Sequence, residues 1–183
     1  MTVSNWIFLA TAAALLLMSW RSLRPPLRHG FYRLFGFQAI NALAWLSYPA
    51  WRLPTEHPLQ LLSGLLLLCS LYLVVHGLYL LVCRGGRNEQ RRDPGNFAFE
   101  NTARLVDEGL YGYIRHPMYA SLLFLLWGFY LKAPGVVTTL LVVGGSLALF
   151  KAARVEEWEN LRTFGRVYRA YIRRTRMFIP YLF

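Results

Sequence analysis

An arginine, a histidine and a proline stand in a row at residues 115 to 117, directly before an apolar run that continues to Leu131. Charged and titratable side chains are costly at the edge of a hydrocarbon layer, so they are candidates for a functional site by default. Proline suits the first position of a helix, where its missing N–H is not needed. We therefore predict a helix that starts at Pro117, with His116 near its N-cap and Arg115 just before it.

The start of this helix has the chemistry of an anion site. Unpaired backbone N–H groups and the helix dipole attract negative charge, and Arg115 and His116 add hydrogen-bond donors beside them. We predict that a carboxylate or phosphate binds here. The alternative is that Arg115 extends to a lipid phosphate while His116 only caps the helix.

Two adjacent glutamates, Glu156 and Glu157, follow the last apolar run of the chain. Two like charges this close repel each other, and burial of either would favour a cation as its partner. Adjacent residues on a helix point about 100° apart, so both side chains need not enter one site. We predict a site for an ammonium or sulfonium group. The alternative is that both carboxylates are solvated and pair with arginines such as Arg154.

The two predicted sites together match one ligand. An anion site at Arg115 and His116 and a cation site at the two glutamates suit a zwitterionic amino-acid group. S-adenosylmethionine carries such a group and also a sulfonium. No cysteine and histidine cluster has the spacing of metal ligands, and no metal site is expected.

The composition predicts a membrane protein. Of 183 residues 56% are hydrophobic, yet the net charge is +11. Nucleic-acid-binding proteins are also basic, but long apolar segments do not separate their basic stripes as they do here. We therefore expect no nucleic-acid partner. The length predicts a single integral-membrane domain over residues 1–183.

A membrane-spanning helix needs about 20 mostly apolar residues. The predicted spans are Asn5–Trp20, Phe31–Trp51, Leu59–Cys83, Tyr119–Leu131 and Val136–Phe150. The last two form a helical hairpin closed by Lys132–Gly135, and because both arms are short, a re-entrant hairpin is the alternative. The predicted fold is all-α, with about five transmembrane helices. Three of them lie in residues 1–83, and residues 84–183 form a catalytic half with the hairpin and an amphipathic tail.

Basic residues predict the orientation of these spans. Eighteen of the twenty lysines and arginines fall on one side, leaving Arg52 and Lys132 on the other. Under the positive-inside rule the N-terminus is outside and the C-terminus cytoplasmic, which agrees with an odd number of crossings. The expected location is the inner membrane of a bacterium or archaeon. Within the second cytoplasmic stretch, the sequence RDPGN at residues 92–96 predicts a turn.

The tail predicts a cytoplasmic catalytic helix. Its apolar face repeats at helical spacing and comprises Glu157, Leu161, Phe164, Tyr168 and Tyr171. Its opposite face is basic and comprises Arg162, Arg166, Arg169 and Arg173. Because Glu157 shares the apolar face, we expect it to meet the cation of the cofactor, while Glu156 holds Arg154 or Arg115. A basic amphipathic helix beside a membrane also binds anionic lipid headgroups, which are therefore candidate partners.

The stretch LVDEGLYGYIRHPMYASLL resembles a motif of the isoprenylcysteine carboxyl methyltransferase and phospholipid methyltransferase superfamily. Members have Gly-x-Tyr-x-x-x-Arg-His-Pro-x-Tyr, a short apolar hairpin and then Glu-Glu. Their closing pattern, Phe-Gly-x-x-Tyr-x-x-Tyr followed by Ile-Pro, is matched by FGRVYRAY and FIP. The resemblance covers about residues 100 to 180.

This resemblance implies an integral-membrane methyltransferase that uses S-adenosylmethionine. The residues it places at the cofactor are Tyr111, Arg115, His116, Pro117, Tyr119, Glu156, Glu157, Tyr168 and Tyr171. His116 would contact the carboxylate end of the cofactor, one glutamate its amino group, and the tail tyrosines would close the site. The implied catalytic residues are Arg115, Glu157, and Arg174 or Arg176, of which one stands for the tail arginine of the family.

The methyl acceptor is not determined by these patterns. We expect a lipophilic or amphiphilic small molecule that enters from the bilayer and carries a carboxylate, amine or thiol. Leu110 and Ala120 replace a proline and a glycine common in the motif, and the displaced tail arginine leaves the acceptor open. One alternative is an NADPH-dependent membrane oxidoreductase similar to sterol reductases, which are usually much longer. The other is a non-catalytic membrane scaffold that binds lipid.

Overall fold

The computed structural model of the chain describes residues 2–23, 28–52, 57–86, 97 and 100–182, and these residues form an all-α structure, as predicted. The helices are α1 (Val3–Ser19), α2 (His29–Ser47), α3 (Pro58–Arg84), α4 (Pro117–Lys132), α5 (Val136–Phe164) and α6 (Arg166–Arg174). Short 3-10 turns include η1 (Trp20–Leu23), η2 (Tyr48–Arg52) and η4 (Gly109–Gly112). The turn expected at residues 92–96 lies outside the described residues.

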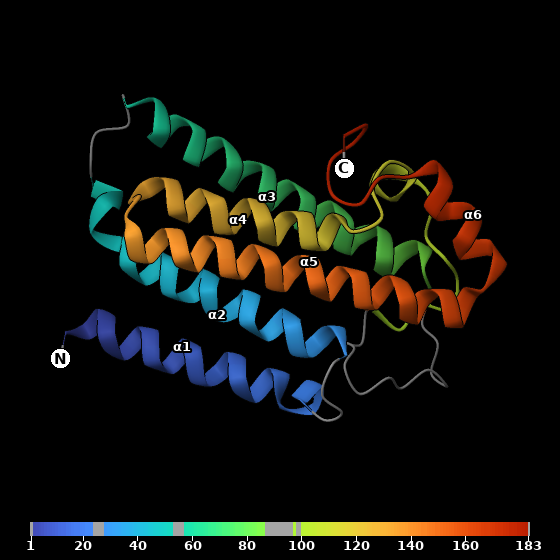
Figure 1. Ribbon diagram of the computed structural model, residues 1–183, viewed down its shortest axis with the longest axis horizontal. Helices are drawn as coiled ribbons and strands as arrows, with labels where there is room; N and C mark the ends of the chain where they lie inside the picture. Colours follow the sequence, from blue (N-terminus) through green and yellow to red (C-terminus); the bar gives the residue numbers. More distant parts are fainter. Residues whose placement is uncertain (1, 24–27, 53–56, 87–96, 98–99, 183) are drawn as a thin grey trace.

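The five long helices lie side by side, and α6 crosses one end of the bundle (Figure 1). Helix α1 packs on α2, α2 on both α4 and α5, and α4 on α3. Helices α3 and α5 are long and apolar enough to cross a membrane, whereas α1 is apolar but has only 17 residues. Large apolar side chains such as Leu65, Leu68 and Leu140 are exposed on the outer faces, as expected for a surface in contact with lipid.

Small residues and serine hydroxyls bring the central helices close together. A Cβ at Gly145 of α5 would lie 2.8 Å from the Cβ of Ala39 in α2. On α3, the hydroxyls of Ser63 and Ser70 each donate a hydrogen bond of 2.8 Å to a backbone carbonyl of α4. Such contacts are typical of helices packed in a membrane, where apolar burial alone gives little attraction between them.

Two expectations for the tail are wrong in detail. The apolar arm predicted to end at Phe150 continues as one helix to Phe164, because no helix-breaking residue intervenes, and the adjacent glutamates lie well inside α5. The tail is also not one continuous helix. Gly165 adopts a φ of 56°, which L side chains rarely adopt, and separates α5 from α6. The apolar face predicted from Glu157 to Tyr171 is therefore divided between two helices.

The entrance of α4 is held by a segment from the far end of the chain. The backbone N–H of Arg115 donates to the carbonyl of Arg176 at 2.7 Å, and the N–H of His116 donates to Met177 at 3.1 Å. In return, the N–H of Arg176 donates to Tyr113 at 2.9 Å. Residues 113–116 and 176–177 thus form a short parallel pairing that fixes the backbone just before Pro117.

Candidate active site

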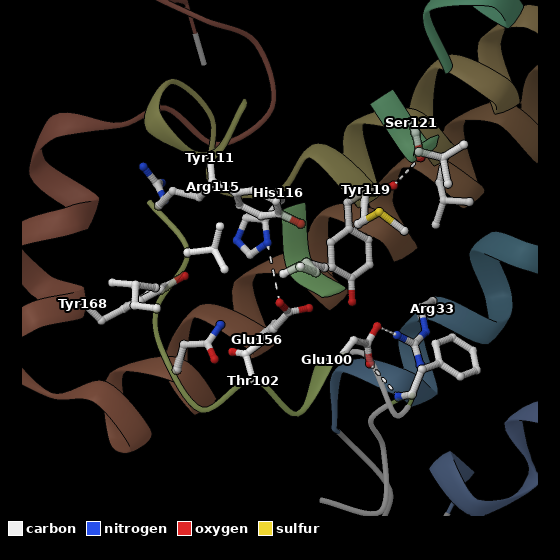
Figure 2. Close-up of a pocket in the computed structure, with 18 of the residues that line it drawn as sticks. Arg33, Glu100, Thr102, Tyr111, Arg115, His116, Tyr119, Ser121, Glu156 and Tyr168 are labelled. Carbon is white, nitrogen blue, oxygen red and sulfur yellow. Dashed lines mark hydrogen bonds and ion pairs between the residues drawn. The ribbon is translucent and has the colours of Figure 1, made fainter. Parts of the chain in front are cut away.

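A cavity of about 270 Å³ lies at the α6 end of the bundle. It is lined by side chains from α2, α3, α4, α5 and α6 and from the segment before α4 (Figure 2). The predicted site residues that line it are Tyr111, Arg115, His116, Tyr119, Glu156, Tyr168 and Tyr171. The structure therefore brings together groups that are up to 60 residues apart in the sequence.

The other predicted site residues do not line this cavity. Pro117 occupies the first turn of α4, as predicted, and is buried beside Gly77 of α3. The guanidinium of Arg174 is more than half exposed and pairs with Asp107. Arg176 lies at a second hollow between α5 and the C-terminal segment. Glu157 is buried behind the wall of the cavity.

The two glutamates exchange the partners expected for them. Arg115 donates from Nε to Glu157 Oε1 at 2.6 Å, and Arg154 donates to Oε2 of the same carboxylate at 3.1 Å. Glu156 instead lines the cavity, with about a quarter of its side chain exposed. The expectation that Glu156 holds these arginines is wrong. The helical period correctly predicted that Glu157 is the more buried of the two, and its carboxylate is taken up there by Arg115 and Arg154.

Arg115 connects the start of α4 to the end of α6 through hydrogen bonds. Besides its bond to Glu157, it donates to the carbonyls of Thr175 at 2.5 Å and Ile172 at 3.3 Å. These carbonyls belong to the C-terminal end of α6, where backbone acceptors lack helical partners. The guanidinium therefore satisfies the end of α6, and Arg115 also lines the cavity.

The His116 side chain lines the cavity and does not cap its helix. It occupies the N-cap of α4, but its side chain makes no capping hydrogen bond. Its Nδ1 lies 3.9 Å from a carboxylate oxygen of Glu156 (Figure 2), and its Nε2 lies 3.6 Å from Oε1 of Glu157. Both distances exceed those of a hydrogen bond.

Two buried polar atoms of the cavity have no hydrogen-bond partner among the described residues, the Nε2 of His116 and the hydroxyl of Tyr119. An unpaired buried polar group costs free energy unless a ligand or water satisfies it. Together with the Glu156 carboxylate, these atoms offer hydrogen-bonding positions and a negative charge around one space. That set fits the ammonium and carboxylate of an amino-acid group.

Three tyrosines close the α6 side of the cavity. The hydroxyl of Tyr171 donates to the carbonyl of Tyr111 at 2.7 Å, which links α6 to η4. Burial raises the pKa of the Tyr111, Tyr168 and Tyr171 phenols above the ordinary value. They are therefore neutral at physiological pH and act as hydrogen-bond donors and aromatic walls.

The structure adds lining residues that the motifs did not reveal, chiefly Arg33, Glu100, Thr102 and Asn160. Asn160 stands one helical turn after Glu156, so the stripe 156, 160, 164 marks the face of α5 that borders the cavity. No local motif in the sequence indicates that Arg33 belongs to a site. From the sequence it served only as one of the basic residues that predict membrane orientation. The opposite wall is apolar and includes Val74, Leu81, Met118 and Leu122.

Comparison with known proteins identifies the family. The model of the phospholipid methyltransferase family matches residues 59–167, from α3 to the start of α6. The chain belongs to the phospholipid methyltransferase family. No curated protein and no solved structure matches it. The matched region contains the Arg-His-Pro entrance and both glutamates, so the family rests on the segment that builds most of the cavity.

Family membership confirms the enzyme class and the cofactor predicted from the sequence. Phospholipid methyltransferases are membrane enzymes that use S-adenosylmethionine, and this chain is accordingly an S-adenosylmethionine-dependent methyltransferase. The family favours a phospholipid substrate over the other lipophilic molecules considered. It also disfavours the reductase and the non-catalytic scaffold.

Proposed function

We propose that the enzyme methylates the amine headgroup of a membrane phospholipid, with the methyl donor held in the cavity of His116, Tyr119 and Glu156. The observation that carries this proposal is the pair of buried, unpartnered polar atoms beside the Glu156 carboxylate. Among the acceptor groups expected from the sequence, the amine is the nucleophile of common phospholipids such as phosphatidylethanolamine.

In this proposal the residues of the chain bind and orient both reactants. When bound, S-adenosylmethionine supplies a methyl group activated by its sulfonium. Glu156 accepts hydrogen bonds from the ammonium of the donor, while His116 and Tyr119 satisfy its carboxylate. Alignment of the reacting atoms can lower a barrier by roughly 7–11 kcal/mol, so the rigid entrance of α4 is the main contribution of the fold.

The apolar wall of the cavity supports entry of the lipid from the bilayer. Val74 and Leu81 come from α3, one of the helices able to span the membrane, and Met118 and Leu122 come from α4. Acyl chains can remain against these helices while the headgroup enters the polar half. Arg162, Arg166, Arg169 and Arg173 are all exposed, which suits the proposed contact of this end with anionic headgroups.

We also propose the predicted topology, with the N-terminus outside and the cavity on the cytoplasmic side. The α6 end carries the described arginines of the tail, whereas Lys132 lies at the turn between α4 and α5. The 16 residues of α4 extend over about 24 Å, less than a bilayer core of about 30 Å. Reporter fusions at Lys132 and Arg173 should give opposite signals, and a cytoplasmic signal at Lys132 would mean that the hairpin is re-entrant.

The cofactor site is tested by binding in detergent. S-adenosylhomocysteine should bind and raise the melting temperature, and NADPH should not. His116→Ala should weaken this binding about tenfold or more, because it removes a buried hydrogen-bonding group without disturbing the backbone pairing of residues 113–116. Transfer of labelled methyl to phosphatidylethanolamine vesicles then tests the acceptor. Stabilisation by NADPH, or unchanged affinity in His116→Ala, would contradict the proposed site.

A further inference from the structure

A second carboxylate borders the same cavity. Glu100, in the segment before η4, lines it together with Glu156 of α5 (Figure 2). The guanidinium of Arg33 donates to its Oε1, and the backbone N–H of Phe97 donates to its Oε2 at 2.8 Å. The Nε2 of His29 lies 3.7 Å from Oε2. The carboxylate is therefore held in one orientation by groups from two parts of the chain.

Packing alone does not explain why an ion pair of Arg33 and Glu100 occupies this position. Arg33 is buried and stacks 4.1 Å above the centre of the Phe97 ring. A buried ion pair costs desolvation, and well-packed apolar residues in its place are often neutral or stabilising. Burial would raise the pKa of the Glu100 carboxyl, but Arg33 and His29 outweigh burial and lower it. Glu100 is therefore ionised at neutral pH on the wall of a ligand cavity.

The three glutamates near the cavity differ in whether they line it. Glu157 pairs with Arg115 and Arg154 and takes no part in the lining. Glu156 and Glu100 do line it, as does Tyr119. The cavity thus has two carboxylates from separate elements of the fold.

Methyl transfer to an amine has a use for two carboxylates. The lone pair of the neutral amine nitrogen forms the new bond to the methyl carbon, while the bond from carbon to sulfur breaks and leaves both electrons on sulfur. One positive charge thereby moves from sulfur to nitrogen, and the proton that the headgroup ammonium must lose to expose its lone pair goes to water before the transfer. Fixed negative charge near the nitrogen stabilises the charge that develops there. A carboxylate or thiolate acceptor would gain no such stabilisation from Glu100, although Arg33 lines the same cavity and offsets part of its charge.

We propose that Glu100 is the residue that binds the acceptor nitrogen and makes the enzyme specific for amine headgroups. Glu156 then serves the methyl donor, and Arg33 is a positioning residue that orients Glu100. This inference rests on the proposed function, because it assigns the second carboxylate of the same cavity. This inference goes beyond the proposed function because it names the side chain that selects the acceptor.

The test separates donor binding from acceptor binding by calorimetry. Glu100→Gln removes the charge but keeps the shape and an oxygen for the Phe97 N–H. In this variant the affinity for S-adenosylhomocysteine should change less than threefold. The affinity of the S-adenosylhomocysteine complex for dihexanoyl phosphatidylethanolamine should fall roughly ten- to a hundredfold. Glu156→Gln is the matched control and should weaken S-adenosylhomocysteine instead. Glu100→Asp, which keeps the charge, should recover part of the lipid affinity.

A second comparison uses the wild-type protein and does not depend on the folding of any variant. Phosphatidylethanolamine should bind the S-adenosylhomocysteine complex at least ten times more tightly than its N-acetyl derivative, which has no basic nitrogen. Equal binding of these lipids would overturn the proposal. So would a loss of S-adenosylhomocysteine affinity in Glu100→Gln as large as in Glu156→Gln, or a fall in melting temperature with both affinities unchanged. Failure of the wild-type protein to bind S-adenosylhomocysteine would instead refute the proposed function.

Discussion

Glu156 and Glu157 are chemically identical neighbours that the fold places in two different environments. Glu157 is buried and accepts hydrogen bonds from two arginines. Glu156 is partly open to the cavity, and its nearest basic group is the His116 ring at 3.9 Å. The carboxylate of Glu157 is engaged on both oxygens by arginines, which ties α5 to its neighbours, whereas Glu156 lines the cavity without such a pair. The difference teaches that partners, and not position in a motif, decide the role.

The largest expected effect is on stability, at the buried member of the pair. Glu157→Gln leaves the Arg115 guanidinium without its countercharge, and breaking a buried pair costs about 3 kcal/mol or more. We expect a marked fall in the melting temperature in detergent, with weaker ligand binding only as a secondary effect. A stable Glu157→Gln protein that no longer binds S-adenosylhomocysteine would restore the original assignment of Glu157 to the cofactor.

The next effect is on ligand affinity, at the open member. Glu156→Gln removes the charge that would face the ammonium of the donor, and a hydrogen bond to a charged group is worth about 1.5–3 kcal/mol. Affinity for S-adenosylhomocysteine, measured by calorimetry, should fall about ten- to a hundredfold while the melting temperature without ligand stays near that of the wild type. A similar loss of stability in both glutamate variants would remove the distinction between them.

A smaller effect is expected where α6 is attached to the entrance of α4. Tyr171→Phe removes the hydrogen bond to the buried carbonyl of Tyr111, which should lower the free energy of unfolding by about 1 kcal/mol. The exposed Tyr113 provides a control, and Tyr113→Phe should leave the melting temperature unchanged. Equal behaviour of the two variants would mean that this hydrogen bond does not hold the helix.

The smallest effect concerns Arg174, one of the implied catalytic arginines. Its pair with Asp107 is exposed, and exposed ion pairs contribute about 0–1 kcal/mol. Arg174→Gln should therefore change stability little, and because Arg174 does not line the cavity, we expect little change in turnover as well. A large loss of methyl transfer with normal stability and normal S-adenosylhomocysteine affinity would show that Arg174 acts on the acceptor.

The sequence predicted those features that depend on local pattern. Apolar runs located the five long helices, and Pro117 located the start of α4. The motif located seven of the residues that line the cavity. The greater burial of Glu157 was predicted correctly, but its pairing with Arg115 and Arg154 was assigned to Glu156, because these contacts depend on tertiary packing. Glu100 and Arg33 were missed because they are 67 residues apart and only tertiary packing brings them together. The number of membrane crossings and the roles of the site residues stay predictions.

The backbone pairing of residues 113–116 with residues 176–177 has a consequence for biosynthesis. Every helix long enough to span the bilayer is encoded before residue 165, so the spans can leave the ribosome and enter the membrane while the pairing partner is still unmade. The backbone of residues 113–116 can be fixed only when residues 176–177 have been synthesised. Until residues 176–177 have been made, these three hydrogen bonds cannot form, and the backbone before Pro117 lacks the partner that fixes it.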